Sequence, residues 1–457
     1  MMGRSTMSAR PYGALGCVLG LAVLLGARAA GAAETALDVR TVRSAIDAGL
    51  DKTYPDLEAL YRDVHAHPEL AFQETRTAAL LATRMRRLGF EVTEHVGKTG
   101  VVAIFRNGAG PVVLVRTELD ALPMEEKAGL PYASRAQQVD ADGKTTFVAH
   151  SCGHDLHMAW WLGAAETLVA MKDRWHGTLM FVGQPAEETI GGARAMVADG
   201  LFTRFPKVDY GFAAHVENGV AGTVEVKQGV LTSASDTVLI TFKGVGAHGS
   251  MPDKSIDPIV EGAHFVDDVQ AVVSRQKDPQ KFGVVTVGAF NAGAVPNIIP
   301  DHADLKLTLR SYDPDVRKVL LEGVTATANA VAQMAHAPPP DIQHPASANP
   351  VLNDSALAAD LAAALKNALG AERVELVGED KPGGTASEDY SDLVVAGIAR
   401  SVYFIIGGYE PATIASYRAK GQAVPVNHSP YFAPAPGPTI RTGVETLTLA
   451  VLSVAGR

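Results

Sequence analysis

Short apolar runs that alternate with helical periodicity constrain the fold of this chain most strongly. Three runs, at residues 101–105, 112–115 and 178–182, consist almost entirely of Val, Leu, Ile, Phe and Met and lie close to Gly or Pro. Such runs are typical of strands that are buried on both faces of a sheet. A helical pattern over residues 37–84 precedes them, and another helix is expected over 157–171. Strands that alternate with helices predict an α/β fold with a doubly wound, mostly parallel sheet.

The pattern changes near residue 233. A half-buried alternating strand is expected first, at residues 237–242, followed by a helix at 258–275. Two strands at 283–290 and 303–310, a second helix at 314–334 and a short final strand at 341–344 complete the unit. This β-α-β-β-α-β order is that of a ferredoxin-like unit. We therefore expect an inserted α+β domain at 233–340 that splits the larger domain into 34–232 and 341–457.

The N-terminus has the layout of a secretory signal peptide. Arg4 and Arg10 precede an apolar run over 14–25, and small residues over 27–32 provide Ala-x-Ala cleavage sites. The run is shorter than the roughly 20 residues that span a bilayer. We expect cleavage after residue 33, a periplasmic or secreted protein, and no membrane association after cleavage.

The charge and the cysteine count narrow the function. The formal net charge is −10, and loss of three arginines with the signal peptide would make it −13. This balance argues against a nucleic-acid partner but not against a small anionic substrate. Cleavage also removes Cys17, so the exported chain would hold Cys152 alone. A lone thiol in an oxidising compartment requires a reason, such as a metal bond or burial.

Side chains able to bind metal gather in four stretches, at residues 150–157, 184–188, 213–215 and 426–430. Cys152 and His154 are one residue apart and can converge on one ion across a turn. Glu187 and Glu188 directly follow an apolar strand, where open α/β sheets place their ligands. One carboxylate can bind metal while the other transfers a proton.

In order along the chain, these stretches and further motifs resemble the M20 metallopeptidase family in its amidohydrolase branch. The resemblance covers about residue 55 to the C-terminus. The motifs are Arg62-Asp63-Val64-His65 with His67-Pro68-Glu69-Leu70, Asp120-Ala121-Leu122-Pro123, the Cys152-Gly153-His154-Asp155 stretch, 184–188, Gly246-Ala247-His248-Gly249-Ser250, Pro296-Asn297, Ser387-Glu388-Asp389-Tyr390 and Asn427-His428-Ser429-Pro430.

The resemblance implies two divalent metal ions per subunit, zinc or manganese with cobalt as a further choice. By position, the ligands would be Cys152, His154, Glu188, His215 and His428. Glu187 would be the general base and acid, and Asp120 would belong to the catalytic motif. The inserted domain would serve as lid and dimerisation domain of a homodimer.

Three residues outside the metal stretches are implied in substrate handling. His248 would stabilise the oxyanion, in its own subunit's site or in the neighbouring one. Asn297 and Arg310 would bind the substrate carboxylate, for which the guanidinium fork of Arg310 is suited.

Two departures from the branch affect the expected pocket. Glu118 stands where the branch has Asp, and Thr189-Ile190 stands where it tends to have Gly. Neither replaces an implied ligand, so we expect them to alter substrate choice more than activity.

The main hypothesis is an exported metal-dependent hydrolase of N-acyl amino acids. The alternative is a carboxypeptidase or dipeptidase on short peptides, since both reactions cleave an amide next to a carboxylate. A further hypothesis is a binding protein that catalyses no reaction. Another is an enzyme with Cys152 as the nucleophile, whose activity would survive metal chelation.

Overall fold

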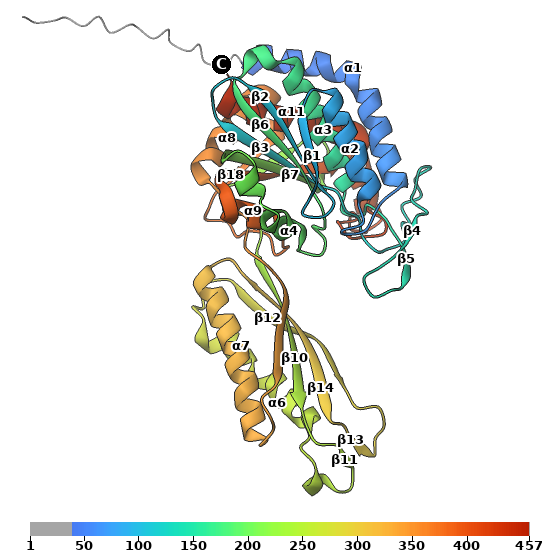
Figure 1. The fold of residues 1–457 in the computed structure, drawn as a ribbon, viewed down its shortest axis with the longest axis vertical. Coiled ribbons are helices and arrows are strands. Elements are labelled where there is room, and N and C mark those ends of the chain that lie inside the picture. Colours follow the sequence, from blue (N-terminus) through green and yellow to red (C-terminus); the bar gives the residue numbers. More distant parts are fainter. Residues whose placement is uncertain (1–38, 457) are drawn as a thin grey trace, which may run out of the picture. The chain divides into compact units, whose positions relative to one another are not determined.

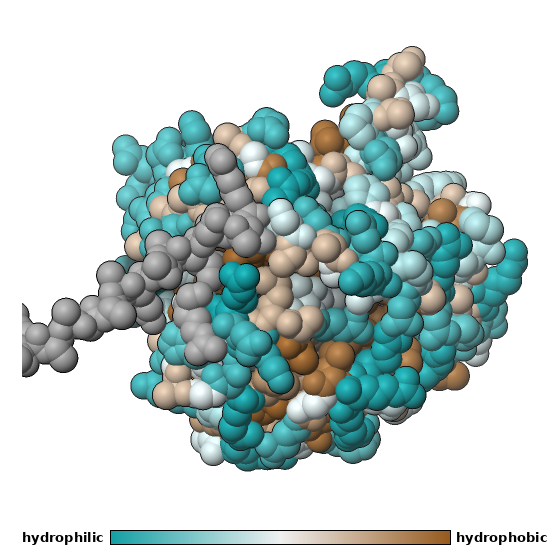
Figure 2. Space-filling view, turned by 90° about the horizontal axis from the view of Figure 1, so that it is seen from above, coloured by the Kyte–Doolittle hydropathy of each residue, from teal (hydrophilic) through white to brown (hydrophobic). Residues whose placement is uncertain are grey.

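The computed structural model describes residues 39–456 (Figure 1). The predicted signal peptide lies outside the described residues. None of the helices within 39–456 is both long and apolar enough to cross a bilayer. On the face in Figure 2, hydrophilic residues are interspersed with smaller groups of apolar ones.

An eight-stranded sheet forms the larger part of the described chain. In spatial order its strands are β1 (Glu91–Val96), β2 (Gly100–Asn107), β6 (Gly177–Gln184), β3 (Val112–Glu118), β7 (Val208–Val220), β18 (Ile398–Tyr409), β8 (Val224–Lys227) and β17 (Val374–Val377). The central neighbours β6, β3, β7 and β18 pair in parallel, whereas β1, β2 and β6 pair antiparallel. The predicted mostly parallel α/β sheet is confirmed.

Helices cover both faces of this sheet. One face packs on α1 (Val39–Ala66), α2 (Thr75–Arg87), α3 (His154–Ala170), α8 (Ser355–Leu369) and α11 (Pro436–Ala455), and the other on α4 (Gly192–Ala198), α5 (Leu201–Arg204) and α9 (Tyr390–Gly397). Alternate residues of one strand join different cores: Val113 and Val115 face the first set, and Leu114 faces the second. Burial on both faces explains why these strands read as continuous apolar runs.

The helical pattern predicted over 37–84 is two helices rather than one. Helix α1 ends at Ala66 and α2 begins at Thr75. Pro68 lacks a backbone N–H and disfavours helical backbone at the residue before it, so the helix stops there. The periodicity on either side gave no sign of this break.

A second, four-stranded antiparallel sheet contains β10 (Ala234–Lys243), β12 (Gly283–Ala292), β14 (His302–Ser311) and β15 (Asp341–Ala348), in the order β12-β14-β10-β15. Helices α6 (Pro258–Asp268) and α7 (Pro314–Met334) pack on it and share its core. This confirms the ferredoxin-like order. Because β15 pairs with β10, the small sheet extends to Ala348, beyond residue 340 where we predicted its domain to end.

Short elements complete the chain. They are β4 (Gln137–Val139) with β5 (Thr145–Phe147), β9 (Gly229–Val230) with β16 (Leu352–Asn353), β11 (Ala247–His248) with β13 (Ile298–Ile299), and helix α10 (Pro411–Ala419).

Candidate active site

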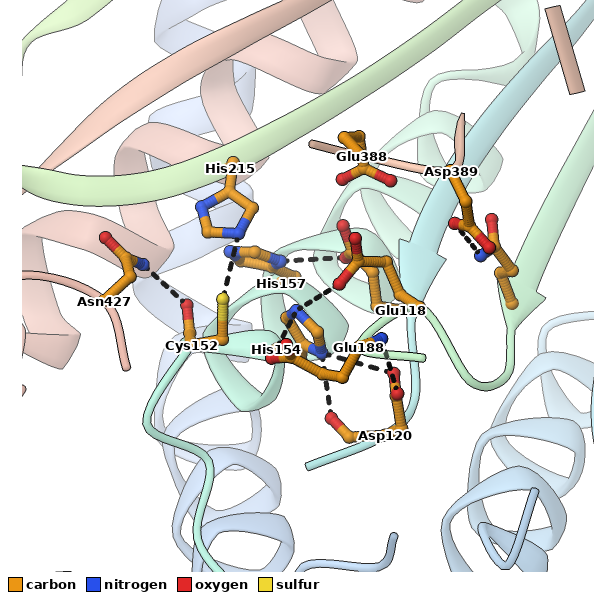
Figure 3. A network of polar contacts seen from close by, with 12 residues as sticks. Glu118, Asp120, Cys152, His154, His157, Glu188, His215, Glu388, Asp389 and Asn427 are labelled. Atoms are coloured by element: carbon orange, nitrogen blue, oxygen red, sulfur yellow. Dashed lines mark hydrogen bonds and ion pairs between the residues drawn. The ribbon is translucent and has the colours of Figure 1, made fainter. Parts of the chain in front are cut away.

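The carboxyl ends of the parallel strands carry the predicted site residues. Asp120 follows β3, Glu187 and Glu188 follow β6, and His215 lies within β7. Figure 3 shows the side chains of Asp120, Glu188 and His215 gathered in one place. Because the strands are parallel neighbours, residues far apart in the sequence meet at this single edge.

The start of α3 supplies Cys152 and His154. Gly153 between them has φ +93°, and a Cβ there would lie 2.4 Å from the side chain of Val216. Glycine is required at this turn both by its backbone angle and by the close approach of β7. The loop between α10 and α11 brings His428 to the same place, where its N–H donates to the Ser151 carbonyl at 2.8 Å.

All five predicted ligands lie in overlapping groups. The ligand atoms of Cys152, His154 and His215 are within 4.8 Å of one another, as are those of Cys152, Glu188 and His428. Cys152 Sγ is 3.4 Å from His215 Nε2, and Glu188 Oε2 is 3.3 Å from His428 Nε2. The two groups share Cys152.

Asp120 fixes two members of this cluster. His154 Nδ1 donates to the Asp120 backbone carbonyl at 2.8 Å, which leaves Nε2 directed at the cluster. The Glu188 backbone N–H donates to Asp120 Oδ2 at 2.9 Å. Within residues 39–456, three buried atoms in the cluster find no hydrogen-bond partner: His154 Nε2, Glu188 Oε1 and Asp120 Oδ1. Such unsatisfied buried atoms are costly unless a ligand occupies the site.

The electrostatics of the cluster indicate a shortage of positive charge. Burial and the nearby glutamates raise the pKa of the Cys152 thiol, and burial raises the pKa of Glu188 to about 7 despite nearby His154. Burial opposes charge on His154, but its bond to Asp120 and the surrounding carboxylates raise its pKa to about 10. A divalent cation would provide the missing charge. The thiolate, imidazole and carboxylate donors fit such an ion.

A second buried charge cluster adjoins the first. Arg116 contacts Glu118, donates to Glu388 Oε1 at 2.8 Å and to Asp389 Oδ1 at 3.4 Å, and its Nε donates to Gln184 at 3.0 Å. The Tyr403 hydroxyl also donates to Glu388, at 2.8 Å. We call Arg116, Glu118, Glu388 and Asp389 the arginine network. Burial and the Glu388 carboxylate raise the pKa of Asp389 to about 8.

Glu118 connects the arginine network to a ligand strand through His157. His157 Nδ1 donates to Glu118 Oε2 at 2.8 Å, and its Nε2 accepts the Val216 backbone N–H at 3.0 Å. The Val216 carbonyl in turn accepts His215 Nδ1 at 2.8 Å and the Asn427 amide at 3.0 Å. The backbone of one residue, Val216, therefore links His157 to the ring of His215 and to Asn427, the residue before His428.

A cavity of about 410 Å³ opens onto the cluster. Its lining includes Cys152, Glu187, Glu188, His215, His428 and Arg310. Arg310 Nη1 is buried and has no hydrogen-bond partner in the part of the chain that the structure describes. His248 and Asn297 are not among the described residues that line this cavity; His248 is exposed and its Nδ1 bonds Ser250 Oγ at 2.7 Å. Their predicted contact with an active site is therefore not made by the described chain itself.

Sequence reasoning gave no role to His157, Glu388 or Asp389. Glu388 and Asp389 were noticed only as part of a motif, because they are adjacent acids that do not directly follow an apolar strand as Glu187 and Glu188 do. His157 lay inside the first metal stretch. Ile190 was noticed as a departure from the usual glycine, with an expected effect on substrate choice.

Sulfur, nitrogen and oxygen donors gathered beside a cavity that an arginine also lines are typical of metal-dependent hydrolases. The comparisons agree. Residues 114–419 match the model of peptidase family M20/M25/M40, and the chain belongs to this family. It is a metal-dependent amidohydrolase or peptidase, which acts on amide or peptide bonds.

Two relatives and one solved structure illustrate the likeness. The chain is 39% identical to hippurate hydrolase of Campylobacter jejuni over 61% of this chain and 70% of the relative. It is 31% identical to N-acetyl-L-cysteine deacetylase of Bacillus subtilis, over 73% of this chain and 76% of the relative. The YXEP protein of Bacillus subtilis, a dinuclear metal-binding M20 peptidase, matches with a TM-score of 0.69 and 25% identity, over 88% of this chain and 99% of that one.

Proposed function

We propose that this protein is an exported amidohydrolase that releases amino acids from N-acyl amino acids with two divalent metal ions. One observation carries the proposal: the five predicted ligands converge, with unpaired buried atoms, on a cavity that also holds an unpaired guanidinium. The relatives named above support this substrate class, because one acts on hippurate and another on N-acetyl-cysteine.

Cys152, His154, Glu188, His215 and His428 would hold the metal ions. Their division into two groups that share Cys152 supports two ions, and their mixed donors suit zinc, manganese or cobalt. When bound, the ions would lower the pKa of water toward about 7 and polarise the carbonyl of the substrate.

Glu187 is the residue we propose to transfer the proton. Its carboxylate is buried, 3.9 Å from His154 Nε2, and lines the cavity. Burial, with the Glu388 carboxylate, raises its pKa well above the ordinary value. A carboxylate of raised basicity takes a proton from water readily and returns it to the leaving nitrogen.

Arg310 would bind the carboxylate of the substrate. It lies on β14 and lines the cavity that contains Glu187, and its Nη1 has no hydrogen-bond partner among the described residues. A partly buried guanidinium with a free nitrogen favours a planar anion, because two parallel hydrogen bonds can form.

His248 and Asn297 would act from a second subunit of a homodimer. Large apolar side chains are exposed around them: Val245 (48%), Met251 (50%) and Ile298 (56%). Burial of these side chains against another copy would favour association. Sedimentation should give twice the chain mass, and mixing inactive His248→Ala and Glu187→Gln chains should restore part of the activity if the sites are shared. A monomer with full activity would contradict this role for His248.

Export rests on the predicted signal peptide. Fractionation of cells, followed by N-terminal sequencing, should place a chain beginning near residue 34 outside the cytoplasm. A full-length chain in the cytoplasm would contradict it.

The test of the catalytic proposal is amine release from N-acyl amino acids and dipeptides, before chelation, after chelation and after metal is restored. We expect activity that is lost with chelator, returns with zinc or manganese, and favours N-acyl amino acids. A preference for dipeptides would establish the peptidase alternative. Activity that survives chelation would instead point to Cys152 as a nucleophile.

The matched variant is Glu187→Gln, which keeps size and hydrogen bonding but cannot accept the proton. Loss of a positioned general base typically costs about 10²–10⁴-fold in rate. We expect such a loss in kcat while metal content stays at the wild-type level. Unchanged turnover would overturn the role of Glu187.

A further inference from the structure

Ile190 has an unusual backbone conformation. Its φ is +54°, in the left-handed region. A β-branched side chain is strongly disfavoured there, because its Cβ substituents crowd the backbone. Such an outlier persists only where the surrounding structure holds it, and outliers of this kind gather at functional sites.

The turn that carries the two glutamates holds Ile190 in place. The Ile190 N–H donates to the Glu187 carbonyl at 2.7 Å, and the N–H groups of Gly191 and Gly192 donate to the Ala186 carbonyl at 3.3 and 3.1 Å. These bonds close the chain directly after Glu187 and Glu188. The geometry that places the carboxylates therefore also determines where the side chain of Ile190 lies.

The side chain of Ile190 lines the cavity of the candidate active site. It is partly exposed there, together with the apolar residues Ala386 and Ile405. Arg310 supplies the cationic part of the same lining. The cavity thus offers a charged group for one end of a substrate and an apolar wall beside the glutamates.

We propose that Ile190 determines acyl-group specificity by forming the apolar wall against which the acyl chain packs. If Arg310 takes the carboxylate of the amino acid, the opposite end of the substrate is the acyl group, and Ile190 belongs to the turn that carries Glu187, the proposed base. The substrate class is then N-acyl amino acids with a branched or aromatic acyl group larger than acetyl. The inference rests on the proposed function and refines it.

The experiment compares kcat/KM for N-acetyl-, N-isovaleryl- and N-benzoylglycine on metal-loaded wild-type, Ile190→Gly and Ile190→Asn proteins. Glycine and asparagine both tolerate the left-handed backbone. Loss of apolar contacts in a pocket changes discrimination by roughly 10–200-fold. We expect at least a tenfold fall for the isovaleryl and benzoyl substrates, and a change of less than about twofold for acetyl. Val139→Gly, at an exposed position outside the cavity, is the control and should leave all three rates unchanged.

Thermal unfolding separates specificity from packing. Glycine adopts the left-handed backbone without strain, so if Ile190 only forms the cavity wall, the Tm of Ile190→Gly should be unchanged or higher. A lower Tm with unchanged rate ratios would assign Ile190 to packing and overturn the inference, while the proposed function would stand. If the wild-type protein hydrolyses none of these substrates, and no other N-acyl amino acid, with any metal, both the proposed function and the inference are wrong.

Discussion

Two adjoining groups of buried carboxylates differ in whether their charges are satisfied. In the arginine network, Glu118, Glu388 and Asp389 all contact the fully buried guanidinium of Arg116. In the metal-ligand cluster, Glu188 Oε1 and His154 Nε2 lie 3.9 Å apart, and neither has a hydrogen-bond partner among the described residues. The first group is held by the hydrogen bonds of a permanent cation, the Arg116 guanidinium, whereas the second keeps ligand atoms that no hydrogen bond satisfies.

This difference indicates which group is structural and which is functional. The arginine network is buried throughout, whereas the metal-ligand cluster extends from buried Cys152 and His154 to exposed His428. Both groups shift the pKa values of their acids. A buried charge that is paired contributes to a defined fold, while an unpaired one is retained at a cost to stability. The comparison therefore predicts opposite consequences when each group is altered.

The largest effect is expected from Arg116→Met. Removal of the guanidinium leaves three carboxylates buried without a counter-charge, and breaking a buried ion pair typically costs about 3–5 kcal/mol. Denaturant unfolding of the metal-free protein should show this loss. Arg441→Met is the control, since its pair with Asp51 is partly exposed and surface pairs are worth at most about 1 kcal/mol. Equal losses for the two variants would show that the arginine network is not a structural unit.

Glu188→Gln should have the opposite effect: it should weaken metal binding and leave the stability of the metal-free protein intact. The substitution removes charge from a carboxylate with an unpaired oxygen, so the metal-free protein should be as stable as wild type or more so. Metal affinity should fall by more than about 100-fold, the upper range found for residues that only support a ligand. Calorimetric titration and unfolding of the same preparation measure both. A metal-free Glu188→Gln protein that is less stable than wild type but binds metal with wild-type affinity would show that Glu188 is structural rather than a metal ligand.

His157→Leu tests the link between the two groups. His157 bonds Glu118 and the Val216 N–H, and the Val216 carbonyl orients His215. Loss of such support typically lowers metal affinity about 10–100-fold. His264→Leu, at an exposed position on α6, is the matched control. Affinities that agree within twofold would show that His157 only fills space.

A dependence of stability on pH is expected from His65, which bonds Asp155 Oδ2 at 2.6 Å and Glu126 Oε2 at 3.1 Å and packs on Tyr61 and Tyr132. Burial opposes its charge, but the two carboxylates raise its pKa from 6.5 to about 10. The stabilisation is complete below the unfolded pKa and is lost as pH rises from about 6.5 to about 10.

Unfolding of wild type and His65→Gln at several pH values measures this effect. The stability difference between them should narrow as pH rises, by at most about 1.4 kcal/mol per pH unit. A constant difference across that interval would mean that His65 is not protonated in the folded state.

The sequence predicted the elements and most of the places where functional residues stand. Apolar runs ended by Glu187 and His215 predicted strands with polar residues at one edge, and a parallel sheet brings such ends together. The break at Pro68 was missed, and the final strand predicted over 341–344 runs on to Ala348, because periodicity does not report where a helix or a strand stops.

Tertiary relations could not be predicted. Arg116 and Glu388 are 272 positions apart, and nothing in either local sequence indicates the partner. The left-handed backbone of Ile190 contradicts its own preference and arises from the turn around it. The pairing of Arg116 with Glu388 balances the buried charges, and the backbone of Ile190 is the feature on which we propose substrate choice to depend.

The most direct test of the account is the number of metal ions bound per chain. Apo protein titrated with zinc, with elemental analysis of the saturated sample, should bind two ions, and the metal should slow alkylation of Cys152, as expected of a ligating thiolate. Cys152→Ser, which alters the residue shared by both groups, should weaken both sites. Protein that binds no metal, or that is alkylated at Cys152 equally fast with and without metal, would contradict the account.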